Sequence, residues 1–508
     1  MRDQYNPSDD LQRISSADFS FLSIMLQHFL HKVRQMQAHG QRSVGFAWTS
    51  AGLHDRGSSL QTEILGGATT FVTMAYIIVL NPAILAHAKL KDEAELPLGA
   101  ITVATILSAI FGSLLMGWYA NRPLAVAPYM GENAFIAFGL ASMQIGWAER
   151  IGAVFVSGAV FVLLTICGLR SWLAQSISTS MKHSFAVGIG LFLMLIGMYL
   201  TGIVTSFVTG LPPEALAVAD GTLKPPDVPL KIGSWHDPRV LLALFGFVLT
   251  AVLMYWRVRG AILIGIILAA GIGYALGLGV DPPKEFAALP FTGEYSLSPI
   301  AFKLNIAGVL RLAFLPLLLT LFLMSFLDTL GTLVAVGSAG DMLDEQGNFP
   351  EIEKPMLVDG LSCMFSALVG TSTSGAYIES ATGIKEGART GLAVVVVAGL
   401  FAVSLFFIPL VRPLQQLTYA YGPALMAVGV LMLPSITKID FSDLTESVPA
   451  LTTITMMLFT FNIANGLTAG LVLYPIFKLA AGRWKDINWG SIVLGLLCLV
   501  YFVFGLPH

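Results

Sequence analysis

The sequence predicts an all-α polytopic membrane protein, with fourteen membrane-spanning segments arranged as two inverted repeats of seven. Composition is the first indication of a bilayer. Of 508 residues, 55% are hydrophobic and only 12% are charged, whereas soluble domains carry about 25% charged residues. Long apolar runs are the second indication. A pair of interrupted segments at matching places in the two halves predicts the inverted repeat.

Apolar runs long enough to cross about 30 Å of hydrocarbon recur along the whole chain. Those of the first half lie near 64–86, 98–118, 123–143, 150–170, 184–206, 239–257 and 259–279. Those of the second half lie near 310–338, 357–370, 372–386, 389–411, 417–435, 449–463 and 465–482, and one more run ends the chain at 488–505. Hydropathy alone therefore gives fourteen or fifteen segments, and several of the second half are short for ordinary spans.

Lysine and arginine in the short loops predict the orientation. Basic residues fall on every second loop of the first half, namely Arg122, Arg170, Lys182, Arg257 and Arg259. These loops share a side with the N-terminus, and cytoplasmic loops carry an excess of Lys and Arg. We therefore expect a multi-pass protein of the cell (plasma or inner) membrane, with residues 1–60 as a cytoplasmic N-terminal extension. Within it, 19–36 is either an amphipathic helix on the membrane surface or part of a disordered tail.

Two segments are poor as plain spanning helices. The third reads RPLAVAPYMGENAFIAFG from Arg122 to Gly139, and the tenth reads GTSTSGAYIESATGIKEG from Gly370 to Gly387. Both are rich in Gly, Pro, Ser or Thr, both carry a carboxylate in mid-run, and each is third in its half. Because seven is an odd number, two sets of seven run in opposite orientations. Paired interrupted segments of such a repeat indicate a transporter's binding site.

A bilayer tolerates non-helical backbone only where protein or a water-filled cavity satisfies it. We therefore expect Ala125–Gly131 and Gly370–Gly375 to be extended and buried, each leading into a short helix near the membrane midplane. The first N–H groups of such helices can bind acceptor atoms of a substrate. One helix start is expected to be capped by hydroxyls of Thr371, Ser372, Thr373 and Ser374. The alternative is two conventional glycine-rich helices packed closely on their neighbours.

Three carboxylates lie inside apolar segments. They are Asp328 in LFLMSFLDTLGTLVAVG, Glu379 in AYIESATG and Glu132 in YMGENAF, where the amide of Asn133 follows. A charge at the bilayer centre costs about 2.5–3.5 kcal/mol on insertion scales, so such residues generally face a pathway. We interpret the three acids as proton-coupling groups, and Asp328 and Glu379 also as acceptors for the N–H groups of a heterocycle. The alternative for Asp328 and Glu379 is a protonated acid that ties two helices together, and Glu132 could instead reach a cavity edge or the next helix.

Aromatic residues lie beside these polar positions. Tyr129, Phe135 and Tyr377 are candidates for stacking on a flat ring, and the alternative for each is ordinary packing in a membrane bundle.

Other functional classes are disfavoured. The net charge of −3 and the lack of a basic stripe predict no nucleic-acid partner. The three widely spaced cysteines show no metal or redox spacing, so neither a metal nor a cofactor is predicted. An enzyme is disfavoured because no HExxH, GxSxG or His/Asp cluster lies in a span. An anion exchanger of similar architecture would favour neutral or basic residues where this chain has acids.

Four motifs together carry a family resemblance. They are GGATTFVTMAYIIVLNPAIL (Gly66–Leu85), APYMGENAFIAF (Ala127–Phe138), SFLDTLGTLVAVG (Ser325–Gly337) and GTSTSGAYIESATGIKEGARTGL (Gly370–Leu392). In this order they resemble the azaguanine/hypoxanthine-type purine permeases, a branch of the nucleobase–cation symporter-2 (nucleobase/ascorbate transporter) group. The resemblance runs from about Arg56 to the last segments, and residues 1–55 lie outside it.

The resemblance implies a fourteen-span fold with short β-strands in spans 3 and 10. It implies a core domain of residues 61–170 (spans 1–4) and 301–411 (spans 8–11). This core moves against a gate domain of residues 171–300 (spans 5–7) and 412–508 (spans 12–14). The implied function is uptake of purine nucleobases of the guanine, hypoxanthine and adenine class, by proton symport and alternating access.

The resemblance also implies roles for individual residues. By motif position, Glu379 grips the purine, Asp328 is linked to substrate or proton, and Asn133 supports the site. We add Phe135, Tyr377 and Ser374 as substrate-binding candidates and Glu132 as a further proton-coupling candidate.

Two residues depart from the span-3 motif of many relatives, since Tyr129 replaces a glycine and Glu132 a leucine. The preferred purine, the choice of proton or sodium, and whether the chain forms a homodimer are left open by the sequence.

Overall fold

The computed structural model describes residues 50–88, 96–168, 176–209, 218–219, 222–223, 230–283, 285–311, 314–340, 342, 349 and 351–504. Most of the expected extension 1–60, including 19–36, lies outside the described residues. Within these ranges, nine helices are long and apolar enough to cross a membrane. The all-α membrane class expected from composition is therefore found.

The first half begins with a short helix, α3 (Ser50–Asp55), and an apolar run in two pieces, α4 (Leu60–Met74) and α5 (Ile77–Leu85). The next helix, α6 (Leu98–Leu115), continues into a π-helical turn, and α9 (Trp147–Ile166) follows the interrupted third segment. The remaining helices of this half are α11 (Thr179–Leu200), α12 (Pro238–Tyr255) and α13 (Ala261–Ala275).

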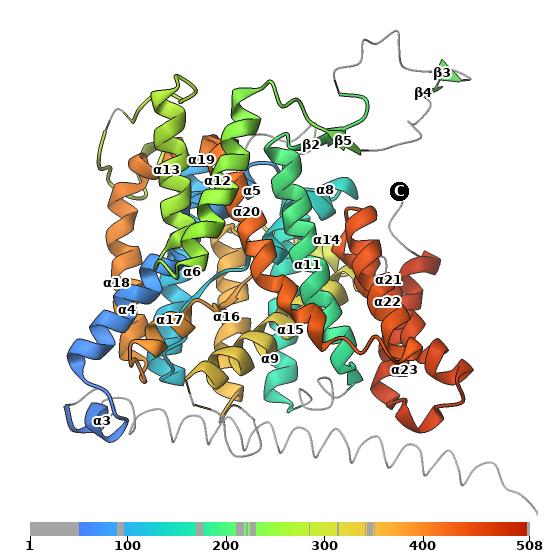
Figure 1. Cartoon of the computed structure of the whole chain (residues 1–508). Coiled ribbons are helices and arrows are strands. Elements are labelled where there is room, and N and C mark those ends of the chain that lie inside the picture. The colour runs from blue at the N-terminus through green and yellow to red at the C-terminus, as the bar shows by residue number, and fades with distance from the viewer. Residues whose placement is uncertain are drawn as a thin grey trace, which may run out of the picture.

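The second half begins with one turn, α14 (Ile306–Val309), and the long helix α15 (Leu315–Ala339), which is followed by α16 (Glu353–Val369). After the interrupted tenth segment come α18 (Leu392–Ser404), α19 (Ile408–Gln416) and α20 (Thr418–Met432). The chain ends with α21 (Leu444–Phe459), α22 (Ile463–Ala480) and α23 (Trp489–Phe504). Figure 1 shows α21, α22 and α23 together at the end of the bundle away from α18 and α13.

The interrupted segments form strands where extended backbone is expected. The third segment consists of β1 (Val126–Pro128), α7 (Met130–Ala134), a π-helical turn and α8 (Leu140–Ser142). The tenth consists of β6 (Ser374–Ala376) and α17 (Ser380–Lys385). The strands pair antiparallel, with Ala127 opposite Gly375. The expected strands of spans 3 and 10 are thus found, and they meet. Two smaller antiparallel pairs, β2 (Val204–Ser206) with β5 (Leu230–Ile232) and β3 (Val218–Ala219) with β4 (Thr222–Leu223), lie elsewhere.

One apolar run differs from its expected form. The run near 64–86 is one candidate span that is interrupted once, because Ala75 and Tyr76 form a right-handed turn between α4 and α5. Pro82 lies inside α5 and has no N–H, so the carbonyl of Ile78, four residues earlier, loses its helical donor. The buried Gln415 Nε2 of α19 donates to that carbonyl at 2.8 Å. A side chain distant in sequence thus satisfies the backbone group that proline leaves open.

Glycines let the half-helix α17 lie directly against α4. A Cβ atom added at Gly383 would collide with the backbone carbonyl of Gly66 and with the Thr70 hydroxyl. Gly399, on α18, has no atom within 4 Å of the equivalent position. The position of α17 therefore depends on the missing side chain at Gly383.

The same change from glycine to alanine should therefore have different effects on stability at positions 383 and 399. Gly383→Ala should destabilise the protein by about 1–3 kcal/mol, because backbone atoms must shift. Gly399→Ala, the matched control, should be neutral or stabilising by up to about 1 kcal/mol, because alanine favours the helix. Thermal unfolding of the two variants in detergent measures this. Equal unfolding midpoints for both would contradict the close packing of α17 on α4.

Candidate functional site

The crossing of β1 and β6 brings together predicted residues from three segments. Glu132 and Asn133 lie on α7, directly after β1. Tyr377 and Glu379 follow β6, with Glu379 at the start of α17. Asp328 lies on α15, which packs against β6, α17 and α7. The crossing is held by the ladder and by Tyr129 N–H to Thr373 O at 3.0 Å and Tyr377 N–H to Ala125 O at 2.9 Å.

Asp328 and Glu379 are the two acids near the crossing that are not fully buried. Both are half-buried, and the helices at which they lie, α15 and α17, pack against each other. Among the described residues, no Lys or Arg forms an ion pair with either acid, and no hydrogen bond reaches Asp328. Two nearby carboxylates repel each other when both are ionised. The pair therefore favours a proton, or a ligand that donates hydrogen bonds.

Glu132 and Asn133 are buried more deeply. Glu132 is 2% exposed, and its Oε2 accepts a hydrogen bond from the Ser325 hydroxyl at 2.7 Å. Asn133 Nδ2 lies 3.4 Å from the backbone carbonyl of Asn81. Neither Glu132 Oε1 nor Asn133 Oδ1 has a hydrogen-bond partner within the described part of the chain. Both side chains therefore lie in the packed interior, unlike the half-buried Asp328 and Glu379.

The expectation that Thr371–Ser374 cap a half-helix is wrong. The start of α17 has no side-chain cap, because β6 separates the hydroxyl run from the helix. The amide of Asn81, on α5, takes up part of the run instead: it donates to Thr371 Oγ1 at 3.0 Å and accepts from the Ser372 hydroxyl at 3.1 Å. Ser374 is fully buried in β6, where its carbonyl accepts a hydrogen bond from Cys363 Sγ at 3.0 Å.

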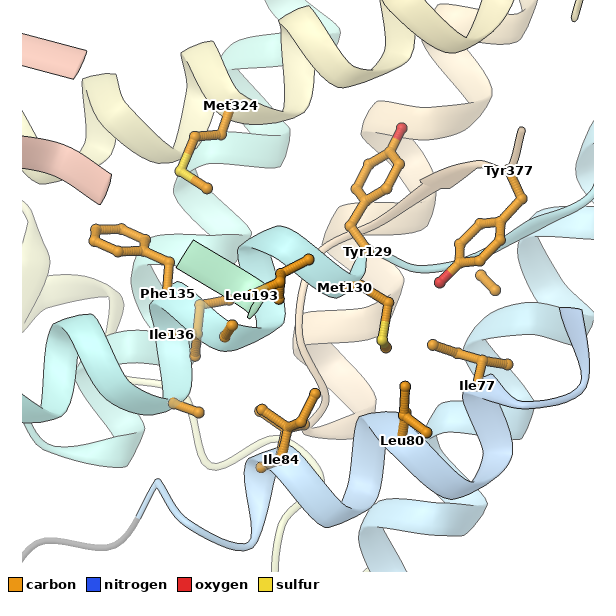
Figure 2. Close-up of a cluster of buried hydrophobic side chains, with 14 of the residues drawn as sticks. Ile77, Leu80, Ile84, Tyr129, Met130, Phe135, Ile136, Leu193, Met324 and Tyr377 are labelled. Carbon is orange, nitrogen blue, oxygen red and sulfur yellow. The ribbon is translucent and has the colours of Figure 1, made fainter. Parts of the chain in front are cut away.

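The three candidate aromatic residues are buried in this conformation. Tyr129 and Tyr377 have nearly parallel rings, with centroids 6.5 Å apart and planes 7° apart. The Tyr377 hydroxyl donates to the carbonyl of Pro128. Phe135 lies in the apolar cluster of Figure 2, on the side of Leu193 and Met324. Their contact with a substrate stays a prediction.

Asp359 is a buried acid that the sequence reasoning missed. It lies on α16 and is fully buried, and its Oδ2 accepts three hydrogen bonds. The donors are the backbone N–H of Ala376 at 3.0 Å, the Thr329 hydroxyl at 2.9 Å and the Tyr129 hydroxyl at 3.2 Å. One carboxylate oxygen therefore connects α16 with β6, α15 and the end of β1. The signal was present, since Asp359 is a lone carboxylate in an apolar run, as Asp328 is.

Within the described ranges, no group of three or more His, Cys, Asp or Glu side chains is arranged to hold a metal ion.

Comparison with known proteins gives a family and a fold. Residues 61–468 match the model of a family described as a permease family. The chain is 41% identical over 449 residues to permease MJ0326 of Methanocaldococcus jannaschii, covering 88% of this chain and 96% of that protein. It is 35% identical to the adenine permease AdeQ of Escherichia coli, covering 88% of this chain and 93% of the relative. It is 34% identical to the guanine/hypoxanthine permease PbuO of Bacillus subtilis, covering 88% and 98%.

Among solved structures, the transmembrane domain of the cyanobacterial bicarbonate transporter BicA is similar, with a TM-score of 0.55 and 16% identity. The match covers 81% of this chain and 97% of that one. At this identity the likeness shows a shared fold alone.

The contacts of Asp359 predict a large loss of stability when the carboxylate is removed. Asp359→Ala should destabilise the protein by about 2–4 kcal/mol, because three buried donors lose their acceptor together. Ser362→Ala is the matched control: it lies on the same helix, is equally buried, and its hydroxyl has no partner within the described chain. Thermal unfolding compares the two variants, and a Ser362→Ala loss as large as that of Asp359→Ala would refute the role.

Proposed function

The chain belongs to the permease family that matches its residues 61–468, and we propose that it takes up purine nucleobases by proton-coupled symport. It is a multi-pass membrane transport protein rather than an enzyme. Relatives named as adenine and as guanine/hypoxanthine permeases, at 34–35% identity over most of their length, support the purine class.

One observation carries the proposal: Asp328 and Glu379 lie half-buried on elements that pack at the β1–β6 crossing, and no Lys or Arg of the described residues forms an ion pair with either acid. A purine presents N–H donors around a flat ring, and carboxylates are strong acceptors for such donors. Uptake of a proton by one acid removes one of the two negative charges and lowers the cost of moving the pair through a region of low dielectric constant.

We propose the following roles for the site residues. Glu379 accepts a hydrogen bond from the purine, and Asp328 accepts either a second one or the coupled proton. Asn133, Ser374, Tyr377 and Phe135 support or complete the binding surface. Glu132, buried against Ser325, is a further place to hold a proton.

The proposed architecture has fourteen spans in two inverted repeats of seven. The antiparallel pairing of β1 with β6 supports the inversion, and so does the packing of α11 on α20, the fifth and twelfth spans. We assign 61–170 and 301–411 to a mobile core, and 171–300 and 412–508 to a gate. In this scheme α23 is an additional helix beyond the two sets of seven. We place the chain in the cell membrane with a cytoplasmic N-terminus, and a homodimer is compatible with the proposal.

Anion transport is the rival function within this fold. The similar transmembrane domain of BicA belongs to a bicarbonate transporter, but 16% identity carries the fold alone. Two unpaired acids at the crossing repel an anion, so the site geometry favours a neutral heterocycle.

The central prediction concerns the two acids. Uptake of guanine, hypoxanthine, adenine, xanthine and uracil into proteoliposomes should be highest for a purine and should rise with an inward proton gradient. Glu379→Gln and Asp328→Asn should each lower that uptake at least about tenfold, the loss expected for a hydrogen bond to a charged group. Glu285→Gln, in an exposed loop, is the control. Uptake that is unaffected by a protonophore would contradict the coupling, and unchanged uptake by both acid variants would contradict the site.

One ion pair joins the proposed gate to the proposed core and offers a test of alternating access. Arg259, in the loop between α12 and α13, forms an ion pair with Glu386, which directly follows α17. The pair joins the gate to the end of the half-helix that begins at Glu379. If the core moves against the gate, this pair must separate in every cycle.

Linking the two positions should therefore stop transport. A short bis-maleimide that joins cysteines in the Arg259→Cys/Glu386→Cys variant should lower purine uptake about tenfold or more. The single-cysteine variants, and Arg257→Cys alone on the same loop, should keep their uptake after the same treatment. Uptake that continues in fully cross-linked protein would show that the loop and α17 do not separate during transport.

A further inference from the structure

Tyr76 contacts the proposed purine-binding acid from the break in the first apolar run. We infer that Tyr76 is a positioning residue that occupies one oxygen of the Glu379 carboxylate and thereby presents the other oxygen to the substrate. This inference rests on the proposed function and deepens it, because it concerns how that acid recognises a nitrogen-rich ring.

The break between α4 and α5 sets the position of Tyr76. At this point the helical bonding changes: Ile78 N–H bonds to Ala75 O at 3.1 Å, and Val79 N–H bonds to Tyr76 O at 3.0 Å. These bonds join residues three apart, as in a tightened turn, instead of four apart. Tyr76 is therefore the last residue before α5, and its side chain is 2% exposed.

The contact itself is short and direct. The Tyr76 hydroxyl donates to Glu379 Oε1 at 2.7 Å, within the range of hydrogen bonds that a charged acceptor strengthens. The two residues are 303 positions apart in the chain. Among the described residues, Tyr76 is the one side chain that donates a hydrogen bond to the Glu379 carboxylate. Oxygen Oε1 is thus held by a side chain of the protein, and Oε2 receives no side-chain donor from the described part of the chain.

The accessibility of Glu379 indicates that its carboxylate can be reached by a substrate. Glu379 is half-buried, and the preceding Ile378 is 54% exposed, although Tyr377 and Ser380 on either side are buried. The chain is therefore more accessible at Ile378 and Glu379 than on either side of them. A carboxylate with one oxygen fixed by Tyr76 cannot rotate freely at this position. A preorganised acceptor binds more tightly, because less side-chain freedom is lost on binding.

A purely structural role for Tyr76 makes a different prediction. If its hydroxyl only tied α17 to the first apolar run, its loss would lower stability and leave binding by folded protein unchanged. A positioning role acts on the affinity for the purine. The two roles therefore separate in the ratio of binding loss to stability loss.

Tyr76→Phe removes the hydroxyl and keeps the ring. Tyr421→Phe is the matched control, because Tyr421 is 1% exposed and its hydroxyl contacts His87 at 3.1 Å instead of an acid of the site. Purified protein is titrated with the purine that wild type binds most tightly, and the unfolding midpoint is measured without purine. We expect Tyr76→Phe to raise the Kd and the KM about tenfold, with a maximal uptake rate within about twofold of wild type. Tyr421→Phe should bind as wild type does.

The outcomes are distinguishable. If wild type binds a purine and Tyr76→Phe binds it with the same Kd, the inference about Tyr76 is overturned and the proposed function is not. Equal losses of affinity in Tyr76→Phe and Tyr421→Phe would also overturn it, because they would indicate a general packing effect. A Tyr76→Phe defect confined to the unfolding midpoint would do the same. Absence of purine binding by wild type would overturn the proposed function, and this inference with it.

Discussion

Two stretches of non-helical backbone meet inside the bundle, and their peptide groups must find hydrogen-bond partners there because lipid supplies none. β1 and β6 meet this requirement by pairing with each other, so neither segment can be extended without its partner. The pairing fixes where the chain re-enters a helix on each side. The positions of Glu132, Asn133 and Glu379 follow from it, since each lies within a few residues of a strand end.

Buried polar side chains of the neighbouring helices α16 and α5 form hydrogen bonds with residues at the crossing. Asp359 accepts from the backbone of β6 and from side chains of α15 and of the residue after β1. Asn81 binds the hydroxyl run that precedes β6. These contacts satisfy groups that would each cost free energy if left unpaired. Among the described acids near the crossing, Asp328 and Glu379 differ from Glu132 and Asp359 in being only half-buried, which is what contact with a hydrogen-bond donor from outside the protein requires.

Much of this arrangement could be predicted from local sequence. Interrupted segments are visible as Gly, Pro, Ser and Thr within apolar runs, and isolated acids are visible by their apolar neighbours. This criterion identifies Asp328 and Glu379, which lie at helices that pack against each other. Asp359 satisfies the same criterion, but its place at the crossing depends on the packing of α16 against β6, which the local sequence does not show.

Other features could not be predicted locally. The Tyr76–Glu379 bond and the Gln415–Ile78 bond join residues more than 300 positions apart, and only the packing of the two halves determines them. The expected capping by Thr371–Ser374 failed for a related reason. Hydroxyls near a helix start favour a cap, but strand pairing with β1 moved the start of α17 beyond their reach.

The most direct test of the account is a structure of the protein determined with a bound purine. The account predicts the ring beside the β1–β6 crossing, with an N–H group within hydrogen-bond distance of Glu379 Oε2 and the Tyr76 hydroxyl still on Oε1. A purine bound away from the crossing, with no contact to Glu379 or Asp328, would contradict it.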